Sequence, residues 1–511
     1  MTGQTTGQMA GQMAGQMAGQ MAGQMAGQTT GQMTGQMTRR IMQEVGSGAG
    51  AQTGRDRGDH AGNHPGGGRD DPLAALAGQH TIRVAACDLN GQMRGKRVPG
   101  SYAGALASGA VRMPLSALNL DITGADIVDS PLVFETGDAD GVLRPTGRGP
   151  VPLPWLAQPQ PLVPMAMHTA DGAPFAGDPR HALAAVLSRY AARGWRVLAA
   201  TELEFTLVDD SGDALAPVRN PQTGRRSAAP GILSMSHLDS FDEFLSALYA
   251  GAAAMGIPAA TITSESGIGQ FEVTLSHQEA MRAADDTWLF KALIRGLARR
   301  HGMAATFMAK PFAEDAGNGM HMHFSVVDET GRNVFDDGGP EGSPLLRAAV
   351  AGCLAAMAPC TLIFAPHANS YARLVPGSHA PTGICWAYEN RTAALRVPGG
   401  APAARRIEHR VAGGDINPYL SFAAILGAAL IGIEDAMVPP APITGNAYAL
   451  DLPRLAPDWA SAIALFAGDP IVARLFPAEL IRNLVLTKRQ ELRLMRDMAL
   501  AEHWKIYLGT V

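Results

Sequence analysis

The chain contains little cysteine and no excess of positive charge. Its 511 residues include 4 cysteines, which are widely spaced and form no Cys-x-x-Cys pair. This argues against a disulfide scaffold, an iron–sulfur site and a zinc knuckle, and it predicts a reducing, cytoplasmic environment. Lys plus Arg number 41 and Asp plus Glu number 46, so the net charge is −5. That balance argues against a partner that is a nucleic acid or a charged membrane surface.

Long uninterrupted apolar runs are also lacking. The N-terminus has neither a basic start nor an apolar stretch, so we expect no secretory signal. The two most apolar stretches are residues 348–366, which Pro359 interrupts, and residues 420–433, which are shorter than the ~20 residues of a membrane span. We interpret both as core helices and expect no membrane partner.

The first segment of the chain is a low-complexity repeat. Residues 1–38 repeat Gly-Gln-Met-Ala or Gly-Gln-Met-Thr, and a Gly-, Asp-, Arg- and His-rich stretch follows up to residue 71. A glycine in every repeat disfavours a helix by ~1 kcal/mol each, and one methionine per repeat offers little apolar surface. We therefore predict a disordered tail over residues 1–71.

The remaining chain predicts two domains of the α+β class. Residues 72–174 have the strand and turn signals of a small domain, beginning with a strand at residues 81–88. Residues 175–511 mix helices with strands that do not alternate regularly, which disfavours a TIM barrel or a doubly wound sheet.

Helix signals in the larger domain are strong. Asp178-Pro179 predicts a helix start, with a stop near Gly194. Ser240-x-x-Glu243 resembles a capping box for a second helix that ends at Gly256. A third helix is expected at about residues 278–300.

Charged residues occur inside apolar strands of this domain. In residues 197–207, a period of two places Glu202 and Glu204 on one face and Leu203 and Phe205 on the other. Neighbouring carboxylates repel each other unless a cation or solvent compensates them. The alternative interpretation is a solvated face of an edge strand. Each further segment of this kind disfavours that interpretation.

Three more segments repeat this pattern. Glu265 and Glu272 flank a glycine-containing bend, and His321, His323 and Ser325 share one strand face. A third segment of this kind places Arg406, Glu408 and Arg410 on one face. Burying five glutamates without cations would cost more than the ~5–15 kcal/mol of a domain's stability.

The donor set is rich in oxygen. Carboxylates with occasional imidazole suit Mg²⁺ or Mn²⁺ better than zinc. Two divalent ions beside arginines would hold a triphosphate and allow transfer of its terminal phosphoryl group. Composition and periodicity thus predict a metal-dependent phosphoryl-transfer enzyme, and they name no substrate.

An ordered series of motifs resembles the glutamine synthetase family from about residue 73 to residue 511. The motifs are Glu202-Leu-Glu-Phe205, Glu265-Ser-Gly-Ile-Gly-Gln-Phe-Glu272, Gly319-Met-His-Met-His323, Asn369-Ser-Tyr-Ala-Arg373, Asn390-Arg-Thr-Ala-Ala-Leu-Arg396 and Arg406-Ile-Glu-His-Arg410. The resemblance implies a small N-terminal β-grasp domain before a large catalytic α/β domain of the glutamine synthetase type. It also implies a homo-oligomeric ring, a hexamer or a dodecamer, with active sites between subunits.

The resemblance also implies the site residues. One metal would be held by Glu204, Glu265 and Glu272, and the other by Glu202, His321 and Glu408. The residues expected around the substrates are Arg373 for the glutamate carboxylate, Arg391, Arg396 and Arg410 for the ATP phosphates and the γ-carboxylate, and His323 and Ser325 toward the nucleotide. For each arginine, a surface or packing ion pair is the alternative. In the implied reaction, ATP activates the glutamate γ-carboxylate as an acyl phosphate, and an amine then displaces phosphate.

The sequence departs from the motifs of family members that use ammonia, and these departures suggest that the substrate is a different amine. Residues 111–117 lack the aspartate of the ammonium pocket, His379 replaces a loop glutamate, and Ala316 replaces an asparagine. The surrounding motifs resemble the γ-glutamylpolyamine synthetase branch, with His379 as a candidate proton acceptor or, alternatively, an exposed loop histidine. We therefore predict an ATP-dependent ligase that joins glutamate to a polyamine or similar primary amine. A glutamine synthetase that uses ammonia and a non-catalytic regulatory paralogue are the alternatives. Tyr448 is expected to be an ordinary loop residue.

Overall fold

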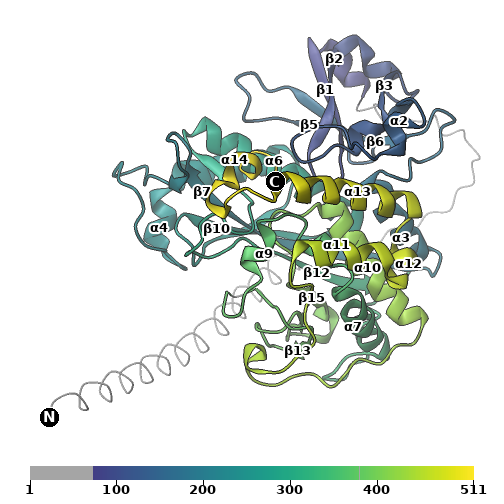
Figure 1. The fold of residues 1–511 in the computed structure, drawn as a ribbon, viewed down its shortest axis with the longest axis vertical. Coiled ribbons are helices and arrows are strands. Elements are labelled where there is room, and N and C mark those ends of the chain that lie inside the picture. The colour runs from purple at the N-terminus through teal and green to yellow at the C-terminus, as the bar shows by residue number, and fades with distance from the viewer. Residues whose placement is uncertain (1–72, 379) are drawn as a thin grey trace, which may run out of the picture. The chain divides into compact units, whose positions relative to one another are not determined.

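The computed structural model describes residues 73–378 and 380–511. The predicted tail at residues 1–71 and the predicted proton acceptor His379 lie outside the described residues. Two β-sheets and a large set of helices make up the described chain (Figure 1). The predicted combination of helices and sheets is thereby confirmed, while the proposed domain boundaries and the β-grasp assignment stay predictions.

The first sheet is formed early in the chain and has the strand order β2-β1-β6-β4-β3, with β5 paired to β6. Strands β1 and β6 are parallel, and the other pairs are antiparallel. Its core contains Ile82, Val84, Leu143 and Met165. The strands are β1 (Thr81–Cys87), β2 (Met93–Pro99), β3 (Val111–Pro114), β4 (Asp140–Pro145), β5 (Val151–Pro152) and β6 (Pro161–His168). The strand predicted at residues 81–88 is confirmed.

The second sheet is larger, and its main strand order is β13-β14-β15-β12-β7-β10-β9, with β8 and β11 paired to β7. Strands β13 and β14 are parallel, and the other pairs are antiparallel. The strands are β7 (Arg196–Asp209), β8 (Ala216–Pro217), β9 (Ala259–Ser264), β10 (Gln270–Glu279), β11 (Ala304–Thr306), β12 (Met320–Val327), β13 (Trp386–Tyr388), β14 (Leu395–Val397) and β15 (Ile407–His409).

Helices pack around the larger sheet and against one another. The α-helices are α2 (Pro131–Phe134), α3 (Pro179–Ala191), α4 (Met235–Ser240), α5 (Asp242–Ala254), α6 (Ala280–Arg300), α7 (Pro344–Met357), α8 (Thr361–Phe364), α9 (Ser370–Arg373), α10 (Pro418–Glu434), α11 (Trp459–Gly468), α12 (Pro470–Leu475), α13 (Ala478–Met495) and α14 (Trp504–Tyr507). Short 3₁₀ helices are η1 (Ala74–Gly78), η2 (Gly100–Ala105), η3 (Leu115–Leu118), η4 (Pro402–Ala404), η5 (Ala447–Ala449) and η6 (Leu500–Glu502).

The apolar stretches behave as core helices, as predicted. Helix α10 is buried over nearly its whole length, and α7 with α8 covers most of residues 348–366. Among the helices that the described residues form, none has both the length and the hydropathy of a membrane span. All 4 cysteines are free and buried, in agreement with the predicted absence of disulfides.

One helix prediction is confirmed in detail and another is wrong. Asp178 caps α3, because its carboxylate accepts the N–H of Arg180 at 2.8 Å. The capping box at Ser240 does not form, since Ser240 is the last residue of α4 and its hydroxyl donates to the carbonyl of Ser236. The third expected helix starts at Ala280 rather than near residue 278, because Gln278 and Glu279 complete β10.

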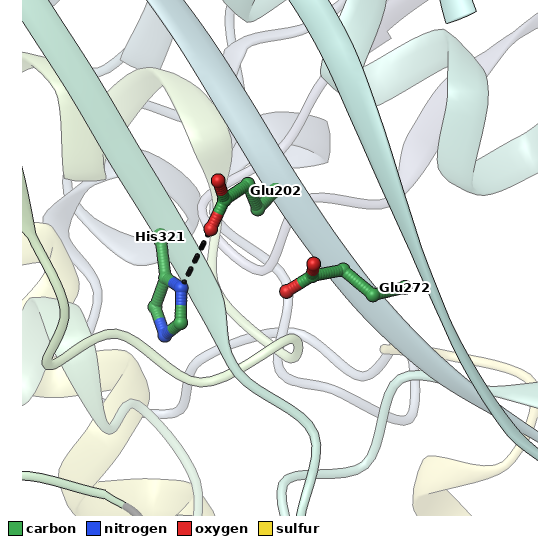
Figure 2. Close-up of side chains that lie close together, drawn as sticks. All are labelled: Glu202, Glu272 and His321. Atoms are coloured by element: carbon green, nitrogen blue, oxygen red, sulfur yellow. Dashed lines mark hydrogen bonds and ion pairs between the residues drawn. The ribbon is translucent and has the colours of Figure 1, made fainter. Parts of the chain in front are cut away.

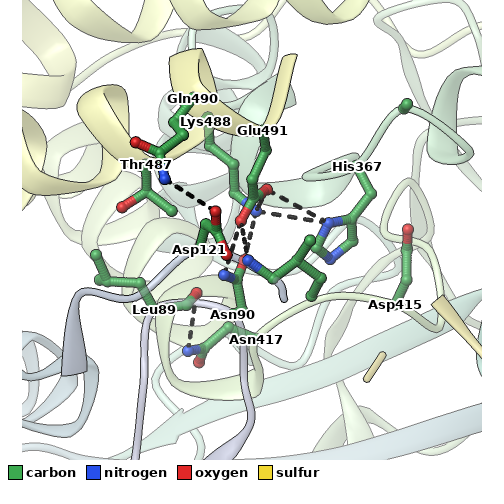
Figure 3. A network of polar contacts seen from close by, with 12 residues as sticks. Leu89, Asn90, Asp121, His367, Asp415, Asn417, Thr487, Lys488, Gln490 and Glu491 are labelled. Atoms are coloured by element: carbon green, nitrogen blue, oxygen red, sulfur yellow. Dashed lines mark hydrogen bonds and ion pairs between the residues drawn. The ribbon is translucent and has the colours of Figure 1, made fainter. Parts of the chain in front are cut away.

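Helix α13 contacts two loops next to the first sheet through buried polar side chains (Figure 3). The Glu491 carboxylate accepts hydrogen bonds from the Asn90 side chain and from the N–H of Ile122, both at 2.8 Å. The Lys488 ammonium donates to Glu491 at 2.8 Å and to the Asn90 side-chain oxygen at 2.5 Å. Lys488 and Glu491 are almost completely buried. The loops after β1 and after η3 are therefore held by one face of α13.

Candidate active site

Polar side chains gather on one face of the larger sheet because its strands alternate strictly. On β7, Leu203 and Phe205 are fully buried in the core, and Glu202 and Glu204 point to the opposite face with partial exposure. The strand geometry requires this separation, since successive side chains point to opposite sides. The predicted pairing of Glu202 and Glu204 on one face is confirmed.

The register of the neighbouring strands adds the other donors. Glu272 on β10 lies opposite Glu204, and His321 on β12 lies opposite Glu202. His323 on β12 lies opposite Glu408 on β15. Directly opposed residues in an antiparallel pair have Cβ atoms about 4.5–5.5 Å apart, so the side chains of four strands meet.

Glu202 is at the centre of this cluster. His321 Nδ1 lies 3.0 Å from one oxygen of Glu202, and His323 Nε2 lies 3.1 Å from the other. Figure 2 shows His321 and Glu272 on either side of the Glu202 carboxylate. Two groups of residues could each hold a metal ion, because the ligand atoms within each group all lie within 4.8 Å of one another. Glu202, Glu272 and His321 form the first group, and Glu202, His323 and Glu408 form the second, so the two groups share Glu202.

Glu204 and Glu265 lie near these sets without joining either of them. The Glu204 carboxylate accepts a short hydrogen bond from the N–H of Gly319, and Glu265 accepts one from the Thr263 hydroxyl at 3.3 Å. Burial, followed by the charge of Glu204, raises the pKa of Glu265. The carboxylates are thus close enough to affect one another's ionisation.

The cluster carries an excess of negative charge. Burial, together with the charges of Glu202, Glu204 and Glu265, raises the pKa of Glu272 to about 9. Burial opposes ionisation of Glu202 as well, but contacts with His321 and His323 outweigh it and lower its pKa. Five glutamates, Glu408 included, with two imidazoles at this spacing fit a divalent cation that prefers oxygen ligands, because such a cation would compensate the repulsion.

Arginines surround the same cluster at Glu408, which is 1% exposed. Arg396 donates from Nη1 to one Glu408 oxygen at 2.9 Å, and Arg410 makes a short contact with the other. Arg406 Nε lies 3.3 Å from His323 Nδ1. Burial opposes ionisation of Glu408, and the charges of Arg410 and His321 outweigh it, so its pKa is lowered.

Arg373 reaches the cluster across Gly319. Its Nη1 donates to the carbonyl of Val411 at 2.8 Å, and the side chain is buried. A Cβ atom added to Gly319 would lie 2.6 Å from Arg373 Nη2 and 3.2 Å from the Glu204 carboxylate. Glycine is therefore required for Arg373 and Glu204 to approach the same stretch of backbone.

Two predicted site residues lie further out. Arg391 is exposed in the loop between β13 and β14, and Ser325 is half-buried on β12 opposite Leu198. Ser325 still shares the β12 face of His321 and His323. The structure therefore joins Arg373, Arg396 and Arg410 to the carboxylates more directly than it joins Arg391.

Glu389 belongs to the site surroundings and was missed in the sequence. Its carboxylate accepts a short hydrogen bond from the N–H of Gly399 and lies 3.4 Å from Arg396 Nη2. Its φ of 50° is in the left-handed region, which costs a non-glycine residue roughly 1–2 kcal/mol. Glutamate is not a residue type that indicates a left-handed backbone conformation, so the sequence did not point to Glu389. The turn after β13 imposes this conformation.

A Glu272→Gln variant is expected to be more heat-stable than the unaltered protein when both are free of metal. From about pH 4.5 to about pH 9, the folded metal-free protein keeps a proton on Glu272 that the unfolded chain releases. Rising pH therefore lowers the stability through this group, and glutamine removes that loss. Melting temperatures in a chelator should differ more at about pH 8.5 than at about pH 6.

Added metal should stabilise the unaltered protein more than it stabilises the Glu272→Gln variant. Adding Mg²⁺ or Mn²⁺ is expected to raise the melting temperature of the unaltered protein, and more so at the higher pH, because the cation must displace the Glu272 proton. Glu272→Gln should lose most of this increase. An equal metal response in both proteins would contradict the placement of Glu272 among the ligands.

Comparisons with known proteins agree with this geometry. A family described as glutamine synthetase, catalytic domain, matches residues 176–507. Gamma-glutamylputrescine synthetase PuuA of Escherichia coli (strain K12) is 38% identical over 376 residues, which are 71% of this chain and 78% of the relative. Glutamate–isopropylamine ligase of a Pseudomonas species is 31% identical over 439 residues, which are 83% of this chain and 94% of that relative.

A solved structure shares the fold of this chain. The complex of GmaS with ADP superposes with a TM-score of 0.73 at 28% sequence identity, covering 85% of this chain and 98% of the other. The match to the catalytic domain covers the strands that carry the carboxylates, the histidines and the arginines described above. On these grounds the chain belongs to the glutamine synthetase family.

Proposed function

We propose that the protein is an ATP-dependent ligase that joins the γ-carboxylate of glutamate to a primary amine. The observation that carries the proposal is the position of Glu202, which two candidate metal groups share within reach of buried arginines. Relatives named for putrescine and for isopropylamine support an amine larger than ammonia.

The cofactor residues follow from the cluster. Mg²⁺ or Mn²⁺ would be held by Glu202, Glu272, His321, His323 and Glu408, with Glu204 and Glu265 nearby. Bound divalent ions would neutralise charge on the phosphates and on the transferring phosphoryl group. His323 and Ser325 are proposed to face the nucleotide.

The arginines would bind and orient the two anionic substrates. Arg373 is proposed to hold the α-carboxylate of glutamate, and Arg391, Arg396 and Arg410 the phosphates and the γ-carboxylate. A γ-carboxylate oxygen attacks the terminal phosphorus of ATP, the bond to the bridging oxygen breaks, and ADP leaves. Arg373, Arg396 and Arg410 stabilise the charge that develops in this step, because they are fixed by Glu408 and by a backbone carbonyl before substrate arrives.

The second step makes the amide bond. The amine nitrogen attacks the acyl carbon of the γ-glutamyl phosphate, and inorganic phosphate leaves with the electron pair of the broken C–O bond. The nitrogen must give up its protons during this step, and His379 is proposed as the acceptor because a histidine pKa of ~6.5 suits the task.

The choice of amine rests on groups that ammonia would need. An ammonium ion requires anionic neighbours, and residues 111–117 contain none, while Ala316 carries no side-chain amide. A primary amine brings apolar carbons that can occupy the vacated space. We further propose a cytoplasmic, homo-oligomeric ring, and a catalytic domain over residues 175–511 that follows a β-grasp domain at residues 72–174.

A phosphate-release assay with glutamate, ATP and Mg²⁺ tests the proposal. The panel contains ammonia, putrescine, spermidine, ethanolamine and isopropylamine, each at equal concentration of the free base. At least one primary amine is expected to exceed ammonia by about tenfold or more in kcat/KM, because the pocket lacks the groups that bind ammonium. The γ-glutamyl amide is identified by mass spectrometry.

Two results would contradict the proposal in different ways. Fastest turnover with ammonia would mean that the protein is a glutamine synthetase with a rebuilt ammonium site. Absence of phosphate release with every amine, in protein that binds ADP and metal, would indicate a non-catalytic regulatory member of the family.

A further inference from the structure

A strap of three residues, 317–319, precedes β12 and lies against both Arg373 and Glu204. A Cβ atom added to Gly317 would lie 3.0 Å from Arg373 Cγ, and one added to Gly319 would lie 2.6 Å from Arg373 Nη2. The N–H of Gly319 donates to the Glu204 carboxylate. The two glycines allow these approaches, but they bring no side chain that could hold the strap in place.

Asn318 supplies the one side chain of the strap, and this side chain is completely buried. Its Nδ2 donates to the carbonyls of Met308 at 2.9 Å and of Thr306 at 3.3 Å. Its Oδ1 accepts hydrogen bonds from the Thr206 hydroxyl at 3.0 Å and from Gln270 Nε2 at 3.1 Å. All four hydrogen-bonding positions of this amide are used, and they attach the strap to β7, β10 and β11.

Gln270 connects the strap to the bend that follows Glu265. Its Nε2 donates a second hydrogen bond, to the carbonyl of Gly317 at 2.9 Å, and its Oε1 accepts the N–H of Gly267 at 2.8 Å. The Gln270 side chain is 2% exposed. Because solvent barely reaches it, a substitution that removed the amide would leave its partners without a replacement.

These contacts lie beside the carboxylates along the same two strands. In the register of β7 and β10, Thr206 lies opposite Gln270. Glu204 and Glu272 form the next pair on this face, because residues two apart in a strand point to the same side. The contact between Gln270 and Asn318 is therefore made on the sheet face that carries the candidate metal ligands.

We propose that Gln270 and Asn318 are positioning residues for the metal-binding part of the site. Glu204 bonds to the strap, Arg373 packs against it, and Glu265 precedes the bend that Gln270 holds. The inference rests on the proposed ligase function and extends it, since neither amide is among the candidate ligands. Carboxylates that repel one another must be held at a fixed spacing for a cation to bind them tightly, and the two amides fix that spacing.

Gln270→Met tests this role, with Gln490→Met as the matched control. Methionine keeps the approximate size of glutamine and removes its hydrogen-bonding groups. Gln490 lies on α13 and makes the same kinds of contact outside the site. Its amide donates to the Asp121 carboxylate and to the Asp126 carbonyl, and its oxygen accepts the N–H of Val128, each at 2.9 Å.

We expect Gln270→Met to weaken Mn²⁺ binding by about tenfold to a hundredfold, because residues that orient metal ligands typically contribute this much. Isothermal titration calorimetry measures the affinity without turnover. Phosphate release with the best amine of the panel should fall by a similar factor when Mn²⁺ is below saturation. Gln490→Met should keep the Mn²⁺ affinity and the rate of the unaltered protein.

Unaltered Mn²⁺ affinity in folded Gln270→Met would overturn the proposal, and so would an equal loss of affinity in Gln490→Met. If Gln270→Met does not fold, Thr206→Val decides the question, because it keeps the side-chain volume and removes the hydroxyl that donates to Asn318. Its Mn²⁺ affinity should fall by about fivefold, the effect of one neutral hydrogen bond, and an unaltered affinity would again overturn the proposal. If the unaltered protein releases phosphate with no amine, the proposed function fails, while the Mn²⁺ affinities still decide whether the two amides position the ligands.

Discussion

Phosphate release by the Glu202→Ala variant is expected to fall by on the order of 10³-fold or more, whichever amine is supplied. Glu202 is the residue shared by both candidate metal groups, and its two oxygens approach His321 and His323 separately. Its removal would weaken both groups at once, and metal-binding measurements should show a loss of affinity along with the loss of activity. Glu202→Gln should behave similarly, because it keeps the size and removes the charge.

Glu279→Gln is the control for Glu202. Glu279 ends β10 on the same sheet, but its side chain is largely exposed and pairs with Arg196. This variant should retain nearly full activity. Near-normal phosphate release by Glu202→Ala, in protein that melts at the usual temperature, would mean that the metal ligands have been misplaced.

Glu491→Ala is expected to lower the free energy of unfolding by about 3–5 kcal/mol. The substitution leaves the buried Lys488 ammonium without its carboxylate and the Ile122 N–H without its acceptor. It leaves the Asn90 amide with only the longer hydrogen bond to the Leu120 carbonyl, at 3.3 Å. A buried charge that loses its partner is costly because the surroundings cannot replace it with water. Urea unfolding of the purified protein, followed by circular dichroism, measures the loss.

The C-terminal pair Lys505–Glu502 serves as the control. It has the same spacing of three residues and a contact of 2.5 Å, but both side chains are about half exposed. Glu502→Ala should leave the free energy of unfolding nearly unchanged, because solvent screens an exposed ion pair. A paired replacement of Lys488 by Met and Glu491 by Leu should recover part of the loss, since it removes both charges together. Equal effects of Glu491→Ala and Glu502→Ala would show that burial of the α13 pair contributes nothing.

The faces of the central strands could be predicted from the sequence because the side-chain period in a strand is two. Leu203 and Phe205 alternate with Glu202 and Glu204 in the sequence and point to the opposite face of the sheet, and Met322 lies in the same way between His321 and His323. The same physics makes Asp178-Pro179 a reliable helix start, since the cap needs contacts within three residues only.

The partners across strands could not be predicted in this way. Whether Glu272 lies nearer to Glu202 or to Glu265 depends on the register between strands and on side-chain rotamers. The resemblance placed Glu272 with Glu204 and Glu265, and the closest ligand atoms in the structure join it to Glu202 and His321. The metal assignment therefore stays a prediction that metal binding by the single variants can test.

Local signals also fail where a neighbouring element competes for the same residue. The Ser240 hydroxyl bonds one turn back because α4 already occupies the preceding residues, so it does not cap α5. Tyr448 contacts Ala380, which is 68 positions earlier, and Glu389 contacts Arg396 and Gly399 across a turn of irregular backbone. No periodicity marks such residues, because their partners depend on how the loops fold rather than on residue type.

The contact between Asn90 and Glu491 also sets an order of events during synthesis. The two residues are 401 positions apart, so at ~5–20 residues per second the ribosome needs roughly 20–80 s to make the second after the first. Throughout that interval water must satisfy the Ile122 N–H and the part of the Asn90 amide that does not bond to the Leu120 carbonyl. The loops of the first sheet therefore cannot form their hydrogen bonds to Glu491 until translation has almost ended.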